Sequence, residues 1–463
     1  MLPIDTMHML SNLLARLIAL VALSAMLAQP VAAQGISILR DAETEALLQD
    51  MTDPLAEAAG LGEGAVEVVL VGDSSINAFV AGGQRIFVHS GLLNAAEDAG
   101  EVQGVIAHEL GHITGGHINR FSEGVGNATK ITLLSALLAA AAAFAGGGEA
   151  AMGVLAAGQQ AAQGSFLAFS RTQEASADAA GAQYLSDAGI SGRGSLAFFE
   201  KLQNFEFRRG IPQGQEREYG RTHPLSGNRI SRLRDDYVAD VAWDTPTDPD
   251  LQRRFERVKA KLYGYIAPSE RTLTAFPEYM TGIPARYARA YAYHKDARMD
   301  DALGEVDALL SAEPDNPYFL ELRGQVLMES GRVDEALPPL REATRLTGSN
   351  PLIASMLGHA LIATEDRANL DEAEQVLRAA IGRDHENPFA WYQLGVVYGQ
   401  RGDTPRARLA SAEQQILSGN PQAALVNAGA AEQALERGTP DWIRAQDVQL
   451  QARAQLERMA ERR

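Results

Sequence analysis

The stretch VIAHELGHITGGHINR, from Val105 to Arg120, concentrates three of the chain's nine histidines within ten residues. His108 and His112 are four residues apart, so on a helix both imidazoles lie on one face. Two imidazoles at this spacing can share one tetrahedral zinc ion, and Glu109 between them can reach a water molecule on the metal as a general base. The pattern favours a zinc peptidase helix, but it also arises by chance and needs context.

A zinc site that hydrolyses a substrate needs a third protein ligand and an open fourth position. The segment SRTQEASADAAGAQYL offers Glu174, with Asp178 one helical turn later on the same face. We expect Glu174 to be the third ligand. Asp178 could accept a hydrogen bond from a ligand imidazole and so fix its orientation. For Glu174 taken alone, a solvated acidic helix face is the plain alternative.

The bulk composition narrows the class of protein. The 463 residues carry a formal net charge of -18 and no long run of lysine or arginine, which argues against nucleic acid as the main partner. The chain has no cysteine, so a disulfide framework, thiolate catalysis and cysteine zinc ligands are excluded. The length predicts two or three domains, each with its own core.

The first 33 residues have the pattern of a secretory signal peptide. Arg16 precedes an uninterrupted stretch of apolar or small residues, and VAA follows, with Val31 and Ala33 placed for cleavage before Gln34. A buried N-terminal helix is the alternative. The signal interpretation predicts export from a bacterial cytoplasm.

Three short stretches before the histidine motif predict strands. Residues 66–70, 76–80 and 85–89 are rich in β-branched and aromatic side chains, and glycine-containing turns separate them. We therefore expect a small antiparallel sheet that leads into the histidine helix.

The segment KITLLSALLAAAAAFA, residues 130–145, is apolar over about fifteen residues. This is shorter than the roughly 18 to 20 residues that span a bilayer. A buried core helix is the favoured interpretation. The alternative is a helix that touches membrane or substrate at the mouth of a site.

The C-terminal 180 or so residues repeat with a period near 34. Asn-Pro recurs four times, at prolines 317, 351, 388 and 421, and a small residue follows seven positions after each proline. Proline suits the first turn of a helix, and small residues let paired helices approach closely. This is the tetratricopeptide signature, and such solenoids bind peptide or protein on a concave face.

Several motifs together resemble the HtpX/CAAX-protease-type zinc metallopeptidases: NAF at 77–79, GLL at 91–93, HELGH and EASAD. The signal pattern and the repeat tail resemble the periplasmic members of that family, and the similarity covers nearly all of the chain after residue 33. The resemblance implies an α+β, mainly α fold. A zincin-type metallopeptidase domain with a small β-sheet is expected over 34–275, followed by an all-α tetratricopeptide solenoid over 280–463.

The resemblance also implies roles for individual residues. It implies zinc on His108, His112 and Glu174, with Glu109 as the catalytic base. Asp178 matches an acid that some accounts of the family treat as a proton donor. We favour the hydrogen-bonding role, because a carboxylate beside zinc and an imidazole should be ionised.

Three further residues match the family pattern. His117 lies nine residues after His108, off the zinc face, so a structural role is expected. His223 precedes a proline, and Arg229 follows at the start of a helix. In this family the loop histidine can occupy the open zinc position and hold the enzyme inactive. Alternatively, His223 or Arg229 stabilises the oxyanion of the tetrahedral intermediate, or the loop is a plain surface turn.

The strand that contains Asn77, Ala78 and Phe79 is the candidate substrate-binding element. An extended peptide can add to an exposed strand edge through main-chain hydrogen bonds, whatever its sequence. Such binding suits a protease that removes misfolded proteins. The alternative is a plain sheet strand with Asn77 at a turn.

These observations lead to one favoured function and two alternatives. The favoured function is a periplasmic zinc endopeptidase that hydrolyses misfolded or stalled outer-membrane proteins. Its solenoid would recruit substrate or the β-barrel assembly machinery, with peripheral membrane contact as a further option. The first alternative is a solenoid-dominated chaperone with latent or minor proteolysis. A purely structural metal is the second, and it fits poorly because structural zinc sites usually have four protein ligands.

Overall fold

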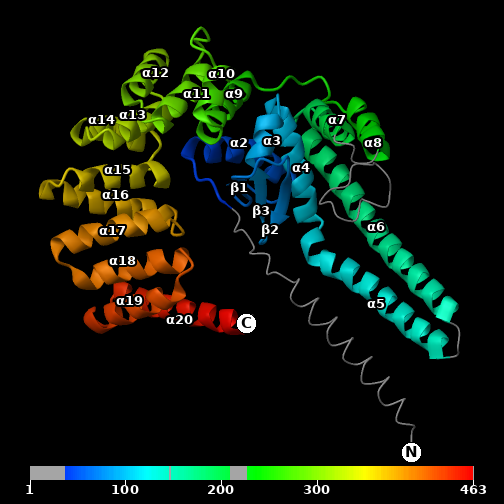
Figure 1. Ribbon diagram of the computed structural model, residues 1–463. Coiled ribbons are helices and arrows are strands. Elements are labelled where there is room, and N and C mark those ends of the chain that lie inside the picture. Colours follow the sequence, from blue (N-terminus) through cyan, green and yellow to red (C-terminus); the bar gives the residue numbers. More distant parts are fainter. Residues whose placement is uncertain (1–36, 145–147, 209–226, 462–463) are drawn as a thin grey trace, which may run out of the picture. The chain divides into compact units, whose positions relative to one another are not determined.

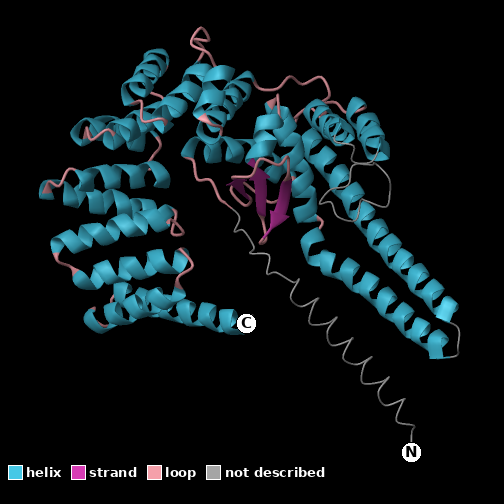
Figure 2. Cartoon of the chain, viewed as in Figure 1, coloured by secondary structure: helices cyan, strands magenta, loops and turns pink. Residues whose placement is uncertain are grey.

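The computed structural model describes residues 37–144, 148–208 and 227–461 (Figure 1). The expected signal peptide and His223 lie outside these residues. The described chain is mainly helical and contains one three-stranded sheet (Figure 2). The elements that build the first half are α2 (Ala42–Ala58), β1 (Glu67–Val71), β2 (Ala78–Ala81), β3 (Arg85–His89), α3 (Ser90–Ala95), α4 (Ala99–Thr114), α5 (His117–Phe144), α6 (Gly148–Asp187), α7 (Arg193–Arg208), α8 (Gly227–Val238), α9 (Pro249–Ile266) and α10 (Ser269–Ala275).

The sheet has the strand order β1-β3-β2. β2 pairs antiparallel with β3 through a tight turn in which Gly82 and Gly83 adopt positive φ angles of 64° and 99°. β1 pairs parallel with β3, so the prediction of an antiparallel sheet was wrong for this pair. The strands do alternate in direction along the chain. However, β3 lies between the other two, which puts β1 beside a strand of its own direction.

The core of the first half lies between the sheet and helices α2 and α4. One face of the sheet contributes buried apolar side chains, and the two helices cover it with leucine, methionine and valine. Aspartates cap both helices: the side chain of Asp41 accepts a hydrogen bond from Thr44 N–H, and Asp98 accepts one from Gly100 N–H. The sheet and α2 therefore hold the histidine helix α4 as the buried centre of this half.

Helix α4 ends at Thr114, and the glycine pair that follows separates it from α5. Gly115 is the C-cap, and Gly116 adopts a positive φ of 62°. α5 then packs along α6, and the two helices form a long antiparallel hairpin (Figure 1).

The expectation that residues 130–145 form a buried core helix was wrong. The described part of this segment lies on α5, where Leu133 and Leu137 are each 62% exposed. An apolar run predicts a helix that is buried by its neighbours. Here α6 covers only one side of α5, and the other side stays exposed. Among the described residues, no helix combines the length and the apolar character needed to cross a membrane.

The second half consists of paired helices, as the repeat period predicts. The four asparagines of the Asn-Pro pairs each cap a helix with their side chains, and proline occupies the first turn. The small residue is required at Gly324 and Gly358, where an added Cβ would lie within 2.6 Å of leucine side-chain atoms on the partner helix. The helices are α11 (Ile283–Lys295), α12 (Met299–Ala312), α13 (Pro317–Glu329), α14 (Val333–Leu346), α15 (Pro351–Ala363), α16 (Leu370–Arg383), α17 (Pro388–Arg401), α18 (Thr404–Leu417), α19 (Pro421–Ala434) and α20 (Pro440–Glu461).

A buried charged cluster joins α2 to α9 and α11, and we call it the junction cluster. Glu43, 2% exposed, accepts a hydrogen bond from the Tyr287 hydroxyl at 2.9 Å and forms an ion pair with Arg257. The Lys261 ammonium lies 2.6 Å from a carboxylate oxygen of Asp41 and 3.3 Å from one of Glu43. The junction cluster therefore fastens the start of the described chain to the first helices of the repeats.

Candidate metal centre

The centre is built where α4 and α6 come into close contact. An added Cβ at Gly111 would lie 2.6 Å from the Ala177 carbonyl oxygen, and one at Gly181 would lie 3.0 Å from the Ala107 backbone. These two glycines let the helix backbones approach, because they carry no side chain at the crossing. The approach brings the His108 and His112 face of α4 against the turn of α6 that carries Glu174.

Three buried side chains converge on one point. The Nε2 atoms of His108 and His112 are 3.1 Å apart, and each lies 3.4 Å from a carboxylate oxygen of Glu174. Ligand atoms about 2.0–2.1 Å from one tetrahedral zinc ion lie about 3.3 Å from one another. Both the donor types and their spacing therefore fit such an ion.

Asp178 and Arg229 support this group from behind. His108 Nδ1 lies 3.0 Å from a carboxylate oxygen of Asp178, which is the contact expected from the sequence. Arg229, on α8, donates from Nε and Nη2 to the two oxygens of Asp178, at 2.7 Å each, and its Nη1 lies 2.9 Å from Glu174. The guanidinium thus holds both carboxylates in place.

The charges set the protonation states of these groups. Burial by itself would lower the pKa of His108, but hydrogen bonds and charges from Asp178 and Glu174 raise it to about 10. Burial would raise the pKa of Asp178, but the contacts with Arg229 and His108 lower it to about 2. Asp178 is therefore ionised at neutral pH and suited to accept a hydrogen bond rather than to donate a proton.

His117 lies beside the centre and outside the converging group. Its Nδ1 is 2.9 Å from His112 Nδ1, and its Nε2 is 3.0 Å from the hydroxyl oxygen of Ser176 on α6. The ring is 6% exposed, and burial lowers its pKa. The three atoms that can hold a metal come from His108, His112 and Glu174 instead.

Glu109 and the walls of the centre complete the site. Glu109 lies on α4 between the two imidazoles and is 2% exposed. The Phe199 ring on α7 packs edge-on against the His108 ring, with ring centres 5.8 Å apart. The Arg229 guanidinium carbon lies over the Phe199 ring, 5.8 Å from its centre. Phe199 is itself buried, so it shields the His108 ring from water.

Sequence reasoning missed two contributors, Ser176 and Phe199. Ser176 lies within the EASAD motif, but nothing in its spacing indicates that it would reach a ring 59 residues earlier in the chain. Phe199 lies in an ordinary amphipathic helix and has no local signal at all.

The predicted substrate strand is an edge strand. β2 contains Ala78 and Phe79, lies at one end of the order β1-β3-β2 and contacts α4. Asn77, just before it, accepts a hydrogen bond from His89 N–H through its carbonyl oxygen. The Phe79 ring stacks on Phe87 of the neighbouring strand, with ring centres 5.0 Å apart.

Comparison with known proteins agrees with this geometry. Residues 42–236 match peptidase family M48, and residues 287–351 and 362–424 match tetratricopeptide repeats. The chain is a metallopeptidase with an M48 domain and tetratricopeptide repeats. This confirms the resemblance, the mainly helical fold and the enzyme class predicted from the sequence.

Two relatives show how far the similarity extends. The chain is 25% identical to the beta-barrel assembly-enhancing protease of Escherichia coli over 382 residues, which is 80% of this chain and 75% of the relative. The chain is also 34% identical to the metalloprotease LoiP of the same species over 168 residues, which is 36% of this chain and 60% of LoiP. The first similarity covers both halves of the metallopeptidase.

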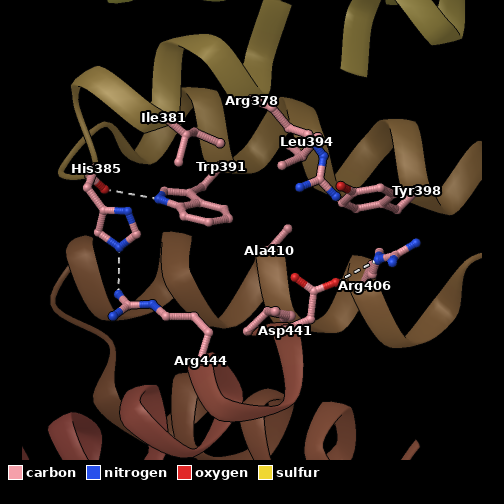
Figure 3. A pocket seen from close by; sticks show the side chains of 12 residues that line it. Arg378, Ile381, His385, Trp391, Leu394, Tyr398, Arg406, Ala410, Asp441 and Arg444 are labelled. Carbon is pink, nitrogen blue, oxygen red and sulfur yellow. Dashed lines mark hydrogen bonds and ion pairs between the residues drawn. The ribbon is translucent and has the colours of Figure 1, made fainter. Parts of the chain in front are cut away.

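The repeats of this metallopeptidase contain a pocket of about 270 Å³ between α16, α17, α18 and α20 (Figure 3). Its apolar surface includes Trp391, Leu394 and Ala410. The polar groups at its rim are paired within the chain: Arg406 donates to Asp441, and the Trp391 indole N–H donates to the carbonyl oxygen of His385.

Proposed function

We propose that this metallopeptidase is a periplasmic zinc-dependent endopeptidase that hydrolyses misfolded or stalled outer-membrane proteins. The observation that carries the proposal is the convergence of His108, His112 and Glu174, with Glu109 on the same buried helix. The predicted signal peptide and the similarity to a beta-barrel assembly-enhancing protease support the compartment and the substrate class.

The residues divide the chemistry between them. Zinc, when bound by the two histidines and Glu174, supplies a Lewis acid that polarises the scissile carbonyl and acidifies a water molecule. Glu109 accepts the proton of the attacking water at its carboxylate and passes it to the leaving amine. Asp178 holds His108 in one tautomer and orientation.

Arg229 acts as a positioning residue in this proposal. Its guanidinium donates to Asp178 and lies 2.9 Å from a carboxylate oxygen of Glu174, so it keeps both carboxylates aligned at the zinc ligands. His223 is then the residue that either stabilises the oxyanion or blocks the open zinc position.

The substrate enters as an extended chain beside β2. Among the described residues β3 is the only strand paired with β2, so the other side of β2, next to α4, can offer main-chain donors and acceptors to an unfolded segment. Recognition would then depend on backbone rather than on sequence, with Asn77, Ala78 and Phe79 as the proposed substrate-binding residues. Folded proteins are excluded because they expose few unpaired strands.

The repeats recruit a protein partner, and we place the contact at the pocket of Figure 3. Because its rim charges are already paired, the pocket favours a large apolar side chain of the partner, such as one from the outer-membrane assembly machinery. Gly382 lines the pocket, and an added Cβ there meets nothing within 4 Å. Gly382→Leu therefore adds an apolar side chain at the pocket lining with no clash at its Cβ, and we expect it to weaken co-purification of the partner. Gly399→Leu is the matched control, because it also meets nothing and lies outside the pocket.

The outer part of the two arms of the α5–α6 hairpin is the proposed peripheral membrane contact. Exposed apolar side chains lie there on both helices: Leu133, Leu134, Leu137, Leu138, Met152 and Leu155. Co-sedimentation with vesicles, compared between the unaltered chain and a Leu133→Ser, Leu137→Ser variant, tests this contact. Equal sedimentation of the two would contradict it.

Degradation of unfolded casein tests the enzymatic proposal. The chain from Gln34, Glu109→Gln and His223→Ala are loaded with zinc, and bound zinc is quantified for each. We expect Glu109→Gln to bind zinc and to lose activity by about 10²–10⁴-fold. The ratio of the unaltered chain to His223→Ala reports whether His223 blocks the site.

A chaperone with latent proteolysis is the second candidate function, and the extent of the repeats favours it. If none of the three proteins cuts casein although zinc is bound, this alternative takes precedence. Suppression of aggregation by the intact Glu109→Gln chain then measures the chaperone activity without interference from cleavage.

A further inference from the structure

The two histidine ligands have different partners on their second nitrogens. An imidazole that binds a metal through Nε2 carries its proton on Nδ1, and it needs an acceptor there to fix its tautomer and orientation. The Nε2 atoms of His108 and His112 face each other, so each Nδ1 points away from the centre. For His108 the acceptor is the carboxylate of Asp178, and for His112 it is the ring of His117.

The contacts of His117 define one direction of hydrogen-bond donation, from His112 through His117 and Ser176 to the Gln173 carbonyl. His112 Nδ1 must donate, so His117 Nδ1 accepts across 2.9 Å. The proton of His117 then lies on Nε2 and is donated to the Ser176 hydroxyl oxygen at 3.0 Å. That hydroxyl donates in turn to the carbonyl oxygen of Gln173 at 2.9 Å, next to Glu174 in the sequence. Each hydrogen has one acceptor, and no step requires a charge.

The backbone between α4 and α5 is shaped to hold the His117 ring. An added Cβ at Gly115 would lie 2.4 Å from His117 Nε2, so only glycine leaves room for the ring. Gly116 adopts a positive φ of 62°, a conformation that glycine takes without strain, and His117 follows it as the first residue of α5. The ring is 6% exposed and contacts the His112 ring edge-on, with ring centres 4.9 Å apart.

We propose that His117, supported by Ser176, is a positioning residue that fixes the tautomer and the orientation of the ligand His112. His117 accepts the Nδ1 hydrogen of His112 as a neutral group, whereas Asp178 accepts that of His108 as a charged group. A second carboxylate would add negative charge to a buried site that already contains Glu109, Glu174 and Asp178. The proposal rests on metal binding as stated under the proposed function.

Zinc affinity, measured by chelator competition, tests the proposal on the full chain from Gln34. The Oδ1 of asparagine takes the branch position of histidine Nδ1, so His117→Asn keeps the acceptor while His117→Ala removes it. We expect His117→Ala to weaken zinc binding by about 10–100-fold, and His117→Asn to stay within about threefold of the unaltered chain. Ser176→Ala should fall between them. His359→Asn, on α15, is the matched control.

The asparagine variant separates positioning from packing. A merely structural ring would make His117→Asn as damaging as His117→Ala, and the thermal stability of both metal-free variants would fall together. Equal zinc affinity of His117→Ala and the unaltered chain, or an equal loss in both variants, would overturn the proposal. If His117→Ala does not fold, unchanged affinity in Ser176→Ala would overturn it.

A spectroscopic measurement supplies an independent readout. In the zinc-loaded chain, ¹⁵N NMR of the imidazoles should show His117 protonated at Nε2 and His112 protonated at Nδ1. The opposite tautomer of His117 would contradict the direction of donation. Failure of the unaltered chain to bind zinc at all would overturn the proposed function as well as this inference, whereas tight binding with no effect of His117 would overturn this inference alone.

Discussion

The metal centre and the junction cluster are both buried groups of charged side chains, but they are organised in opposite ways. At the junction, Lys261 pairs with both Asp41 and Glu43, and Arg257 pairs with Glu43, so each of these two carboxylates faces a cation. At the centre, Arg229 lies behind the carboxylates of Glu174 and Asp178 as their cationic partner, while the ligand atoms of three side chains face one common point.

The difference shows what distinguishes a metal site from a structural charge network. Burial and strong pairing occur in both clusters, so neither property identifies the active site. Convergence of Nε2 and carboxylate oxygen atoms at about the edge length of a coordination tetrahedron occurs at the centre. A structural network should therefore fail by unfolding when it is broken, and a metal site should fail by losing its ion.

The largest expected effect comes from removing a ligand. Glu174→Ala leaves two imidazoles on one helix, which do not hold a tetrahedral ion against chelators, so zinc content and casein cleavage should both be lost. Zinc measured after dialysis checks this. Zinc retained at one equivalent per chain would show that Glu174 is not a ligand and would remove the contrast between the two clusters.

Breaking the junction cluster should have the converse result. Lys261→Met leaves Glu43 and Asp41 with one cation fewer in a buried position, which costs about 3–5 kcal/mol of unfolding free energy. Urea denaturation measures that loss, and zinc affinity of the folded fraction should not change. Arg253→Met, which removes an exposed cation on the same helix, is the control and should cost little.

The support of the first ligand gives a smaller effect. Asp178→Asn keeps the shape of the side chain but removes the negative charge that His108 and Arg229 face. We expect zinc affinity to fall by about 10–100-fold without loss of the fold. Chelator competition measures the change. A larger loss of stability than of affinity would place Asp178 with the structural network instead.

Glu321 on α13 gives an effect whose size depends on pH. Burial raises its pKa from 4.5 to about 8, and Asp41 and Glu43 add to the rise while Lys261 opposes it. Because the folded state keeps the proton of Glu321 to a higher pH than the unfolded state does, the contribution of Glu321 to stability is greatest below pH 4.5 and is lost as the pH rises toward 8. Glu321→Gln removes this fall.

Thermal melts at several pH values check the sign of this effect. The melting temperature of Glu321→Gln should exceed that of the unaltered chain at pH 8 and match it closely below pH 4.5. Glu457→Gln, an exposed glutamate on α20, should show no such trend. A variant less stable at pH 8 than the unaltered chain would contradict a raised pKa.

The parts of the site that follow from local periodicity could be predicted from the sequence. His108, Glu109 and His112 share one helix, and Glu174 and Asp178 share one turn, so spacing alone indicates which side chains face together. The repeats could also be predicted, because proline, glycine and alanine recur in phase over four units.

The parts that depend on contacts between distant segments could not be predicted. β1 pairs parallel with β3 because β3 lies between β1 and β2 in the sheet, and strand propensity does not predict the order of strands. The exposure of Leu133 depends on how much of α5 is covered by α6, which the apolar composition does not state. Ser176 reaches His117 only because the crossing of α4 and α6 brings them together. The role of His223 stays a prediction.

The hairpin of α5 and α6 has a consequence for the spacing between ligands in related chains. His112 precedes the hairpin and Glu174 lies on its returning arm, 62 residues later, while the contacts that align them are at its base. Deleting about 11 residues, three helical turns, from each arm would shorten both by about 16 Å and leave those contacts in register. Insertions and deletions should therefore accumulate here in matched pairs, so that sequence distance between the second and third ligands is a poor guide to kinship.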